Sequence, residues 1–271
     1  MRREGFLAYG ARQMTECVCA LEACLSALAP DDLRAVEDAL AAAHRLQTCL
    51  TLFAKGYPSP RVALWKRRLR RIVRALNALR DCLRLAEWVA AQQPPPECVA
   101  GVRRALLRLH QRAETLHQTL RQAQQHWRDD HIPNEITGLS RRWAQSFGDE
   151  AVDADYALQV WQRFRREQLA ALESPASSLA VQWGRVRAVL EACDLLAPLG
   201  LPLECPDDLQ ARSDALDAQR FRDEAHRLLR ELLQGERERA LQYAGNLRSF
   251  GRIQKGWEWL MEHIGLDIIP S

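Results

Sequence analysis

Residues 65–74 read Trp-Lys-Arg-Arg-Leu-Arg-Arg-Ile-Val-Arg, a run whose apolar and basic side chains recur with the period of an α-helix. On a helix, Leu69, Ile72 and Val73 face one side and are available for a buried core. Residues four positions apart stack one turn above another on the other side. The run therefore predicts an amphipathic helix of a bundle with a cationic outer face. Lys66, Arg70 and Arg74 form the stripe on that face, with Arg67 and Arg71 beside it.

The composition extends this prediction to the whole chain. Ala, Leu, Arg, Gln and Glu, all strong helix formers, dominate its 271 residues, and 47% of the residues are hydrophobic. Runs of β-branched and aromatic residues, which strands require, are missing apart from short pieces such as Ile268-Ile269. We therefore expect an all-α protein built from helical bundles.

Prolines, glycines and capping residues divide the chain into two similar halves. Each half has a lead-in helix, a turn, a second helix, a proline-containing loop and then long helices, as in two tandem antiparallel bundles related by pseudo-twofold symmetry. An acidic, non-periodic segment at 149–155 marks the boundary, so the predicted halves are residues 1–148 and 149–271. Helices are expected over 5–28, 31–55, 60–91, 97–127, 134–147, 152–173, 178–196 and 207–263, the last with breaks near Gly235 and Gly245.

The charge pattern is more informative than the net charge of +3. Like charges at i and i+4 repel by a few tenths of a kcal/mol per pair, so the stripe suggests either a bound anion or acidic partners on neighbouring helices. No Gly-rich phosphate loop, HExxH motif, GxSxG motif or paired catalytic carboxylate is present. We expect a protein without enzymatic activity or cofactor. The residues from His126 to His131 are a minor alternative as metal ligands, although such residues also commonly end helices.

Eight cysteines are scattered without a CxxC or Cys/His ligand spacing, which favours reduced core thiols. The N-terminal residues lack the apolar segment of a signal peptide, and no stretch approaches the ~20 apolar residues of a membrane span. A cytoplasmic protein without a membrane partner is therefore expected. The cysteines are at positions 17, 19, 24, 49, 82, 98, 193 and 205.

Four segments of the chain carry motifs of a known family: Leu7-Ala8 with Ala11-Arg12-Gln13, Ala35-Val36 to Phe53, Trp65 to Asp81, and Ser177 to Glu191. Together they resemble the CHAD family, the conserved histidine α-helical domain. The resemblance implies two bundles related by pseudo-twofold symmetry, whose basic surface and central cavity bind inorganic polyphosphate without catalysis. It also implies links to polyphosphate or polyhydroxyalkanoate granules.

The chain departs from the family pattern at the motif positions themselves. Glu37 and Ser177 occupy the histidine positions, and Leu40 and Ala180 replace the arginines three residues later. His44 stands in the first position of an Arg-Arg pair, Gln47 replaces the following arginine, and Gly184 replaces a basic residue of the second half. The polyphosphate-binding residues expected from the stripe and the resemblance are Arg45, Lys66, Arg67, Arg70, Arg71, Arg74, Arg80, Arg185 and Arg187.

Two functions follow as hypotheses. The first is binding of inorganic polyphosphate or a similar polyanion, without recognition of a nucleic-acid sequence, because arginine side chains one turn apart can neutralise successive phosphates. The second is a degenerate scaffold that contacts proteins or storage granules, favoured by the lost basic positions. Acidic partners on the stripe would favour the second hypothesis, and an open cavity lined by it would favour the first.

Overall fold

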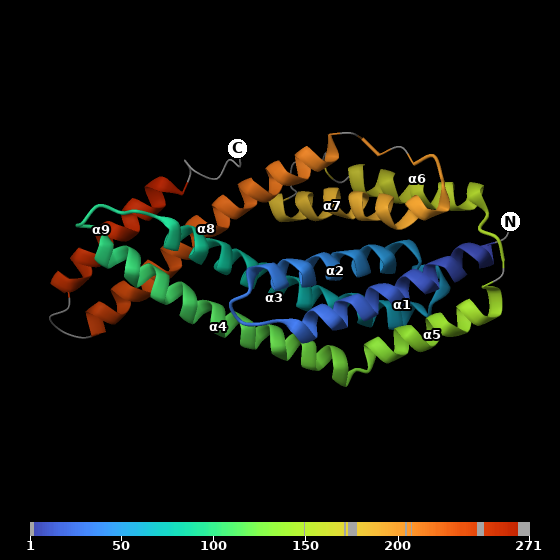
Figure 1. The fold of residues 1–271 in the computed structure, drawn as a ribbon, viewed down its shortest axis with the longest axis horizontal. Helices are drawn as coiled ribbons and strands as arrows, with labels where there is room; N and C mark the ends of the chain where they lie inside the picture. Colours follow the sequence, from blue (N-terminus) through green and yellow to red (C-terminus); the bar gives the residue numbers. More distant parts are fainter. Residues whose placement is uncertain are drawn as a thin grey trace. The chain divides into compact units, whose positions relative to one another are not determined.

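The structure is a computed structural model that describes residues 3–148, 150–170, 172, 178–203, 205–206, 208–242 and 247–264. The described residues form helices without strands, which confirms the all-α prediction (Figure 1). The elements are α1 Arg3–Ala27, α2 Leu33–Leu52, η1 Ala54–Gly56, α3 Ser59–Ala91, α4 Val99–Asp129, α5 Ile132–Phe147, α6 Ala154–Ala170, α7 Leu179–Leu196, η2 Ala197–Leu199, α8 Leu209–Gln242 and α9 Leu247–His263.

Helix boundaries follow the predicted signals at most ends. The Asp32 carboxylate accepts a hydrogen bond from the Ala35 amide (2.9 Å) and caps α2, and Ser178 caps α7 in the same way. The predicted break near Gly235 was wrong, because α8 continues through it to Gln242. The predicted break near Gly245 lies outside the described residues.

The chain groups into two compact units that do not coincide with the predicted halves. Unit 1 comprises residues 1–76 and 119–216, and unit 2 comprises residues 77–118 and 217–271. The long helices α3, α4 and α8 each contribute residues to both units. This grouping describes packing, and the internal repeat of two halves stays a prediction.

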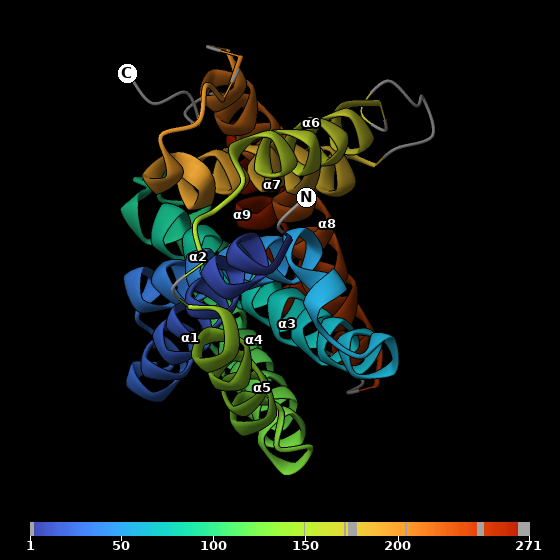
Figure 2. The ribbon, with the colours of Figure 1, turned by 90° about the vertical axis from the view of Figure 1, so that its right-hand side faces the viewer.

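Unit 1 is built around α1, which packs between α2 and α5, while α7 packs on α2 and α6 lies along α7 (Figures 1 and 2). Its core contains large apolar side chains without solvent exposure, among them Met14, Leu46 and Leu69. Two buried tryptophans keep their indole N–H groups satisfied: Trp65 donates to Glu135 (2.8 Å) and Trp127 to Glu22 (3.0 Å).

Unit 2 consists of the end of α3, most of α4 and α8, and α9, with Leu109, Leu229 and Trp257 fully buried. Helices α4 and α9 touch through their backbones at Gly101 and Gly256. A Cβ atom on Gly101 would lie 2.7 Å from the Cα atom of Gly256, closer than real Cβ atoms come to a neighbour. Only glycine permits this approach, so the α4–α9 contact is sterically defined.

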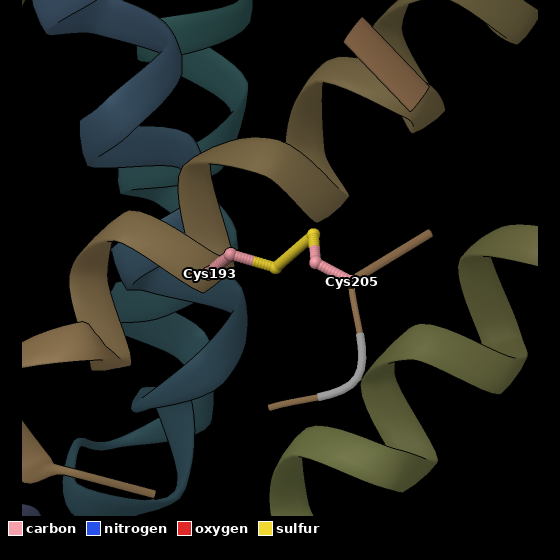
Figure 3. The surroundings of a disulfide bond; sticks show 2 residues. All are labelled: Cys193 and Cys205. Atoms are coloured by element: carbon pink, nitrogen blue, oxygen red, sulfur yellow. A yellow bond between two sulfur atoms is a disulfide. The ribbon is translucent and has the colours of Figure 1, made fainter. Parts of the chain in front are cut away.

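Cys193 and Cys205 form a disulfide with Cα atoms 6.9 Å apart, so the prediction of reduced thiols was wrong for this pair (Figure 3). The bond joins α7 to the segment that follows η2, across a separation of 12 residues. The other six cysteines are free. Within the described residues, no helix is long and apolar enough to cross a membrane.

Candidate functional site: a basic face and pocket in unit 1

The first half of α3 presents its cations outward because its apolar side is buried. Trp65, Leu69 and Ile72 are fully buried in unit 1 and set the rotation of the helix. We call the cationic side the α3 basic face. It consists of Lys66, which is half-buried, and the exposed residues Arg67, Arg70, Arg71 and Arg74.

Acidic groups near this helix are occupied by other arginines. Arg61 pairs with Glu135 (3.1 Å), and Arg68 pairs with Asp130. Hydrogen bonding from Arg68 lowers the pKa of Asp130, which keeps that carboxylate ionised. Among the residues that the structure describes, no carboxylate forms an ion pair with the α3 basic face. Arg67 acts electrostatically on Asp130 without forming an ion pair, so the charge of Lys66, Arg70, Arg71 and Arg74 is the part available to a ligand.

Lys66 carries the clearest electrostatic signature of this face. Burial lowers its pKa, and the neighbouring charge of Arg70 lowers it further. Arg70 turns back toward Lys66, since its Nε donates to the Lys66 carbonyl (3.1 Å). Both effects disfavour the charged ammonium, and an anion placed beside it would offset them.

A pocket of about 290 Å³ opens beside these two cations, between α2, α3, α6 and α7 of unit 1. Its described lining has two cationic side chains, several hydroxyl, amide and imidazole groups, and no carboxylate, so it suits an anion that also accepts neutral hydrogen bonds. Its lining residues are His44, Gln47, Thr48, Thr51, Lys66, Arg70, Phe164, Gln168, Gly184 and Ala188.

Three residues at positions where the family resemblance predicts basic motif residues line this pocket, namely His44, Gln47 and Gly184. The lysine and the arginine of the lining, Lys66 and Arg70, both come from α3. The buried ring of His44 packs edge-on against Trp183 (5.3 Å between centroids). Other departures lie outside the lining: Glu37 and Ala180 are exposed, Leu40 is buried, and Ser177 lies outside the described residues.

Arg45, Arg185 and Arg187 do not line the pocket. Arg187 pairs with Glu191 (3.4 Å), and Arg45 acts on the same acid. Burial raises the pKa of Glu191, with Arg187 and Arg45 acting in the opposite direction. The Arg185 Nε is buried and has no hydrogen-bond partner within the described residues. Arg45 and Arg187 thus share Glu191, away from the pocket lining, and Arg185 is not shown to join them.

Arg80 requires a correction, because it is engaged inside unit 2. Its side chain is 6% exposed and binds Asp81 (3.1 Å) and Asp217 (3.1 Å). Arg220 also binds Asp81 (2.7 Å), and Arg84 binds Asp217 (2.7 Å). A guanidinium shared between two carboxylates and shielded from solvent cannot reach a polyphosphate chain. The predicted role of Arg80 in anion binding is replaced by a structural one.

The alternative metal site is not supported by geometry. No group of three His, Cys, Asp or Glu side chains within the described residues could hold a metal ion. In the segment from His126 to His131, Asp129 accepts a hydrogen bond from Gln125 (2.7 Å). Asp130 binds Arg68. His131 takes a left-handed backbone conformation (φ 54°) between α4 and α5.

The sequence reasoning missed most of the neutral pocket lining. Thr48 and Thr51 follow His44 by four and seven positions and therefore share its face of α2, a signal that the helical period contains. Phe164 and Gln168 come from α6, and only tertiary packing brings them to this place.

The comparisons with known proteins agree with this architecture. The family model described as the CHAD domain matches residues 12–178, a span that contains the α3 basic face and most of the helices of unit 1. Comparison with curated proteins and with solved structures found no match. With the family model covering more than half of its length, the chain belongs to the CHAD-domain family.

Proposed function

We propose that this protein binds inorganic polyphosphate or a similar polyanion, without catalysis, through the α3 basic face and its adjoining pocket. The observation that supports the proposal best is the set of cations on α3 without a carboxylate partner among the described residues. Lys66, Arg70 and Arg74 rise along the helix by about 6 Å per step. A flexible chain of phosphates can follow that spacing.

The binding energy in this proposal is electrostatic. A polyanion neutralised by several cations releases condensed counterions, which makes affinity fall steeply as salt is added. The ligand also relieves the repulsion between Lys66 and Arg70, which the free protein carries. Hydroxyl and amide groups of the pocket, such as Thr48 and Gln168, can donate neutral hydrogen bonds to phosphate oxygens.

A second candidate is the scaffold that contacts proteins or granules without binding phosphate. His44, Gln47 and Gly184 in the pocket favour it, because the expected motif has at these positions basic residues that would attract phosphate. Cytoplasmic location and granule association belong to these proposals, and both are compatible with either function.

A titration separates the two candidates. Long-chain polyphosphate is titrated at low salt into three proteins. They are the wild type, the double variant Arg70→Gln/Arg74→Gln and the control double variant Arg141→Gln/Arg142→Gln. The control pair is exposed on α5 of unit 1 and lacks an ion-pair partner within the described residues, as does the test pair. Both variants lose two charges, so total charge is matched.

We expect tight binding that weakens at least about tenfold in the α3 variant, a loss of about 1.4 kcal/mol, with much less change in the control. Absence of binding at low salt, or equal losses in both variants, contradicts the proposal and favours the scaffold.

A further inference from the structure

Unit 2 carries a second concave surface, unrelated to the α3 basic face. It is a groove of about 550 Å³ formed by α4, α8 and α9. Its apolar lining includes Leu107, whose side chain is 45% exposed although it is large and hydrophobic. We call this surface the unit 2 groove. Its lining residues are Ala100, Arg103, Arg104, Leu107, Glu236, Arg239, Ala240, Ser249, Phe250 and Ile253.

The walls of the groove are held by two independent features. The glycine contact between α4 and α9 fixes one side. Glu236 fixes the other, because its 5% exposed carboxylate binds Arg104 (2.9 Å) and Arg108 from α4 and Arg239 (2.9 Å) from its own helix. A surface held in this way exists before any partner arrives, which reduces the entropy cost of binding.

The charge around the groove is strongly unbalanced. Three arginines, at positions 104, 108 and 239, bind the carboxylate of Glu236, and a fourth, Arg103, also lines the groove. Arg103 is exposed and forms no ion pair within the described residues, and Arg239 remains about half exposed although it contacts Glu236. An apolar surface with an excess of three positive charges is complementary to a ligand that is both apolar and acidic.

We infer that the unit 2 groove binds an acidic amphipathic helix of a partner protein. The apolar side of such a helix would lie against Leu107, Phe250 and Ile253, and its acidic residues would reach Arg103 and Arg239. A bare polyphosphate chain would gain nothing from the apolar lining. The groove lies in the other unit from the polyphosphate site proposed above.

The test uses synthetic peptides as probes. A fluorescein-labelled peptide of about 18 residues, roughly 27 Å long as a helix, carries leucines at i, i+3, i+4 and i+7 and glutamates elsewhere. One control peptide has lysines in place of the glutamates, and another has the same composition with the leucine stripe scrambled. Fluorescence anisotropy measures binding of each to the full-length protein.

Protein variants locate the binding surface. Leu107→Ser and Arg103→Glu alter the groove, and Val181→Ser and Arg141→Glu are their controls. Val181 on α7 of unit 1 is 44% exposed, which matches Leu107, and Arg141 is exposed on α5 of the same unit. All four positions are on the surface, so circular dichroism is expected to show unchanged folding.

The expected result is micromolar binding of the acidic amphipathic peptide and at least about tenfold weaker binding of both control peptides. Leu107→Ser and Arg103→Glu should each weaken binding by about the same factor, and Val181→Ser and Arg141→Glu should not. The inference is overturned if the scrambled peptide binds equally well or if the groove variants bind the peptide as tightly as the control variants do. It is also overturned if dodecanoate, an acidic apolar molecule that is not a peptide, occupies the groove while no peptide binds.

Discussion

Replacing Arg80 by glutamine should destabilise the protein and leave the anion site of the folded protein intact. The Arg80 guanidinium donates to Asp81 through Nε (3.2 Å) and Nη2 (3.1 Å), and Nη2 also reaches Asp217 (3.1 Å). Breaking a buried ion pair by removing one partner costs about 3–5 kcal/mol. Asp81 keeps Arg220 and Asp217 keeps Arg84, so we expect the lower end, about 3 kcal/mol.

The pH dependence of this loss gives the prediction a second readout. Burial raises the pKa of Asp81 from 3.8 to about 6, and Arg80 acts to lower it. Without Arg80 the pKa of Asp81 rises further. The folded variant then binds a proton on Asp81 in a pH range where Asp81 of the unfolded chain is ionised. Stability of the variant then falls as the pH rises through that range. The destabilisation should be smaller at about pH 5 than at neutral pH.

Urea unfolding followed by circular dichroism measures this effect, with Arg70→Gln as the matched control. Arg70 is exposed and unpaired with any described carboxylate, so its replacement should change the free energy of unfolding by no more than about 0.5 kcal/mol. A loss below about 1 kcal/mol for Arg80→Gln, together with a polyphosphate affinity reduced as in Arg70→Gln, would refute the structural assignment of Arg80.

Three further predictions follow from single groups. Burial and Arg70 disfavour the charged form of Lys66. Lys66→Met should therefore increase the free energy of unfolding in phosphate-free buffer and at the same time weaken polyphosphate binding. Chemical unfolding and a polyphosphate titration of the same preparation measure these two effects. Burial would raise the pKa of Glu236, but the arginine partners outweigh burial, so the pKa of Glu236 is lowered. The ionised Glu236 therefore stabilises the folded protein above about pH 4.5, and this contribution is lost as the pH falls through the lowered pKa. Glu236→Gln should therefore cost about 2 kcal/mol at neutral pH, less in acid, measured by urea unfolding at each pH. Cys193→Ser removes the disulfide between two cysteines 12 residues apart and should lower the free energy of unfolding by about 3 kcal/mol. Dithiothreitol should lower the free energy of unfolding of the wild type and leave that of this variant unchanged.

The local parts of the fold could be predicted because they depend on near neighbours in the sequence. The apolar side of residues 65–74 sets the rotation of α3, and Asp32 and Ser178 cap helices by bonding to amides three residues away. Gly235 was wrongly predicted to break the helix, which continues through it. Its intrinsic cost in a helix is only about 1 kcal/mol, which the ion pairs of the adjacent Glu236 can offset.

The parts that failed depend on residues distant in the sequence. Arg80 looked like a site residue because its partner Asp217 is 137 positions away. The disulfide of Cys193 depends on how the chain turns after α7, which no spacing rule reports. The pocket combines α2 and α3 with α6 and α7, so its volume and neutral lining became visible only with the tertiary structure.

The salt dependence of polyphosphate binding tests the central claim most directly. The slope of log K against log salt counts the phosphates that cations neutralise, and we use the coefficient of about 0.7 per phosphate that holds for single-stranded nucleic acids. We predict a slope less steep by about 1.4 for Arg70→Gln/Arg74→Gln and an unchanged slope for Arg141→Gln/Arg142→Gln. An unchanged slope in the α3 variant, or the same change in both, would show that the α3 basic face does not bind the polyanion.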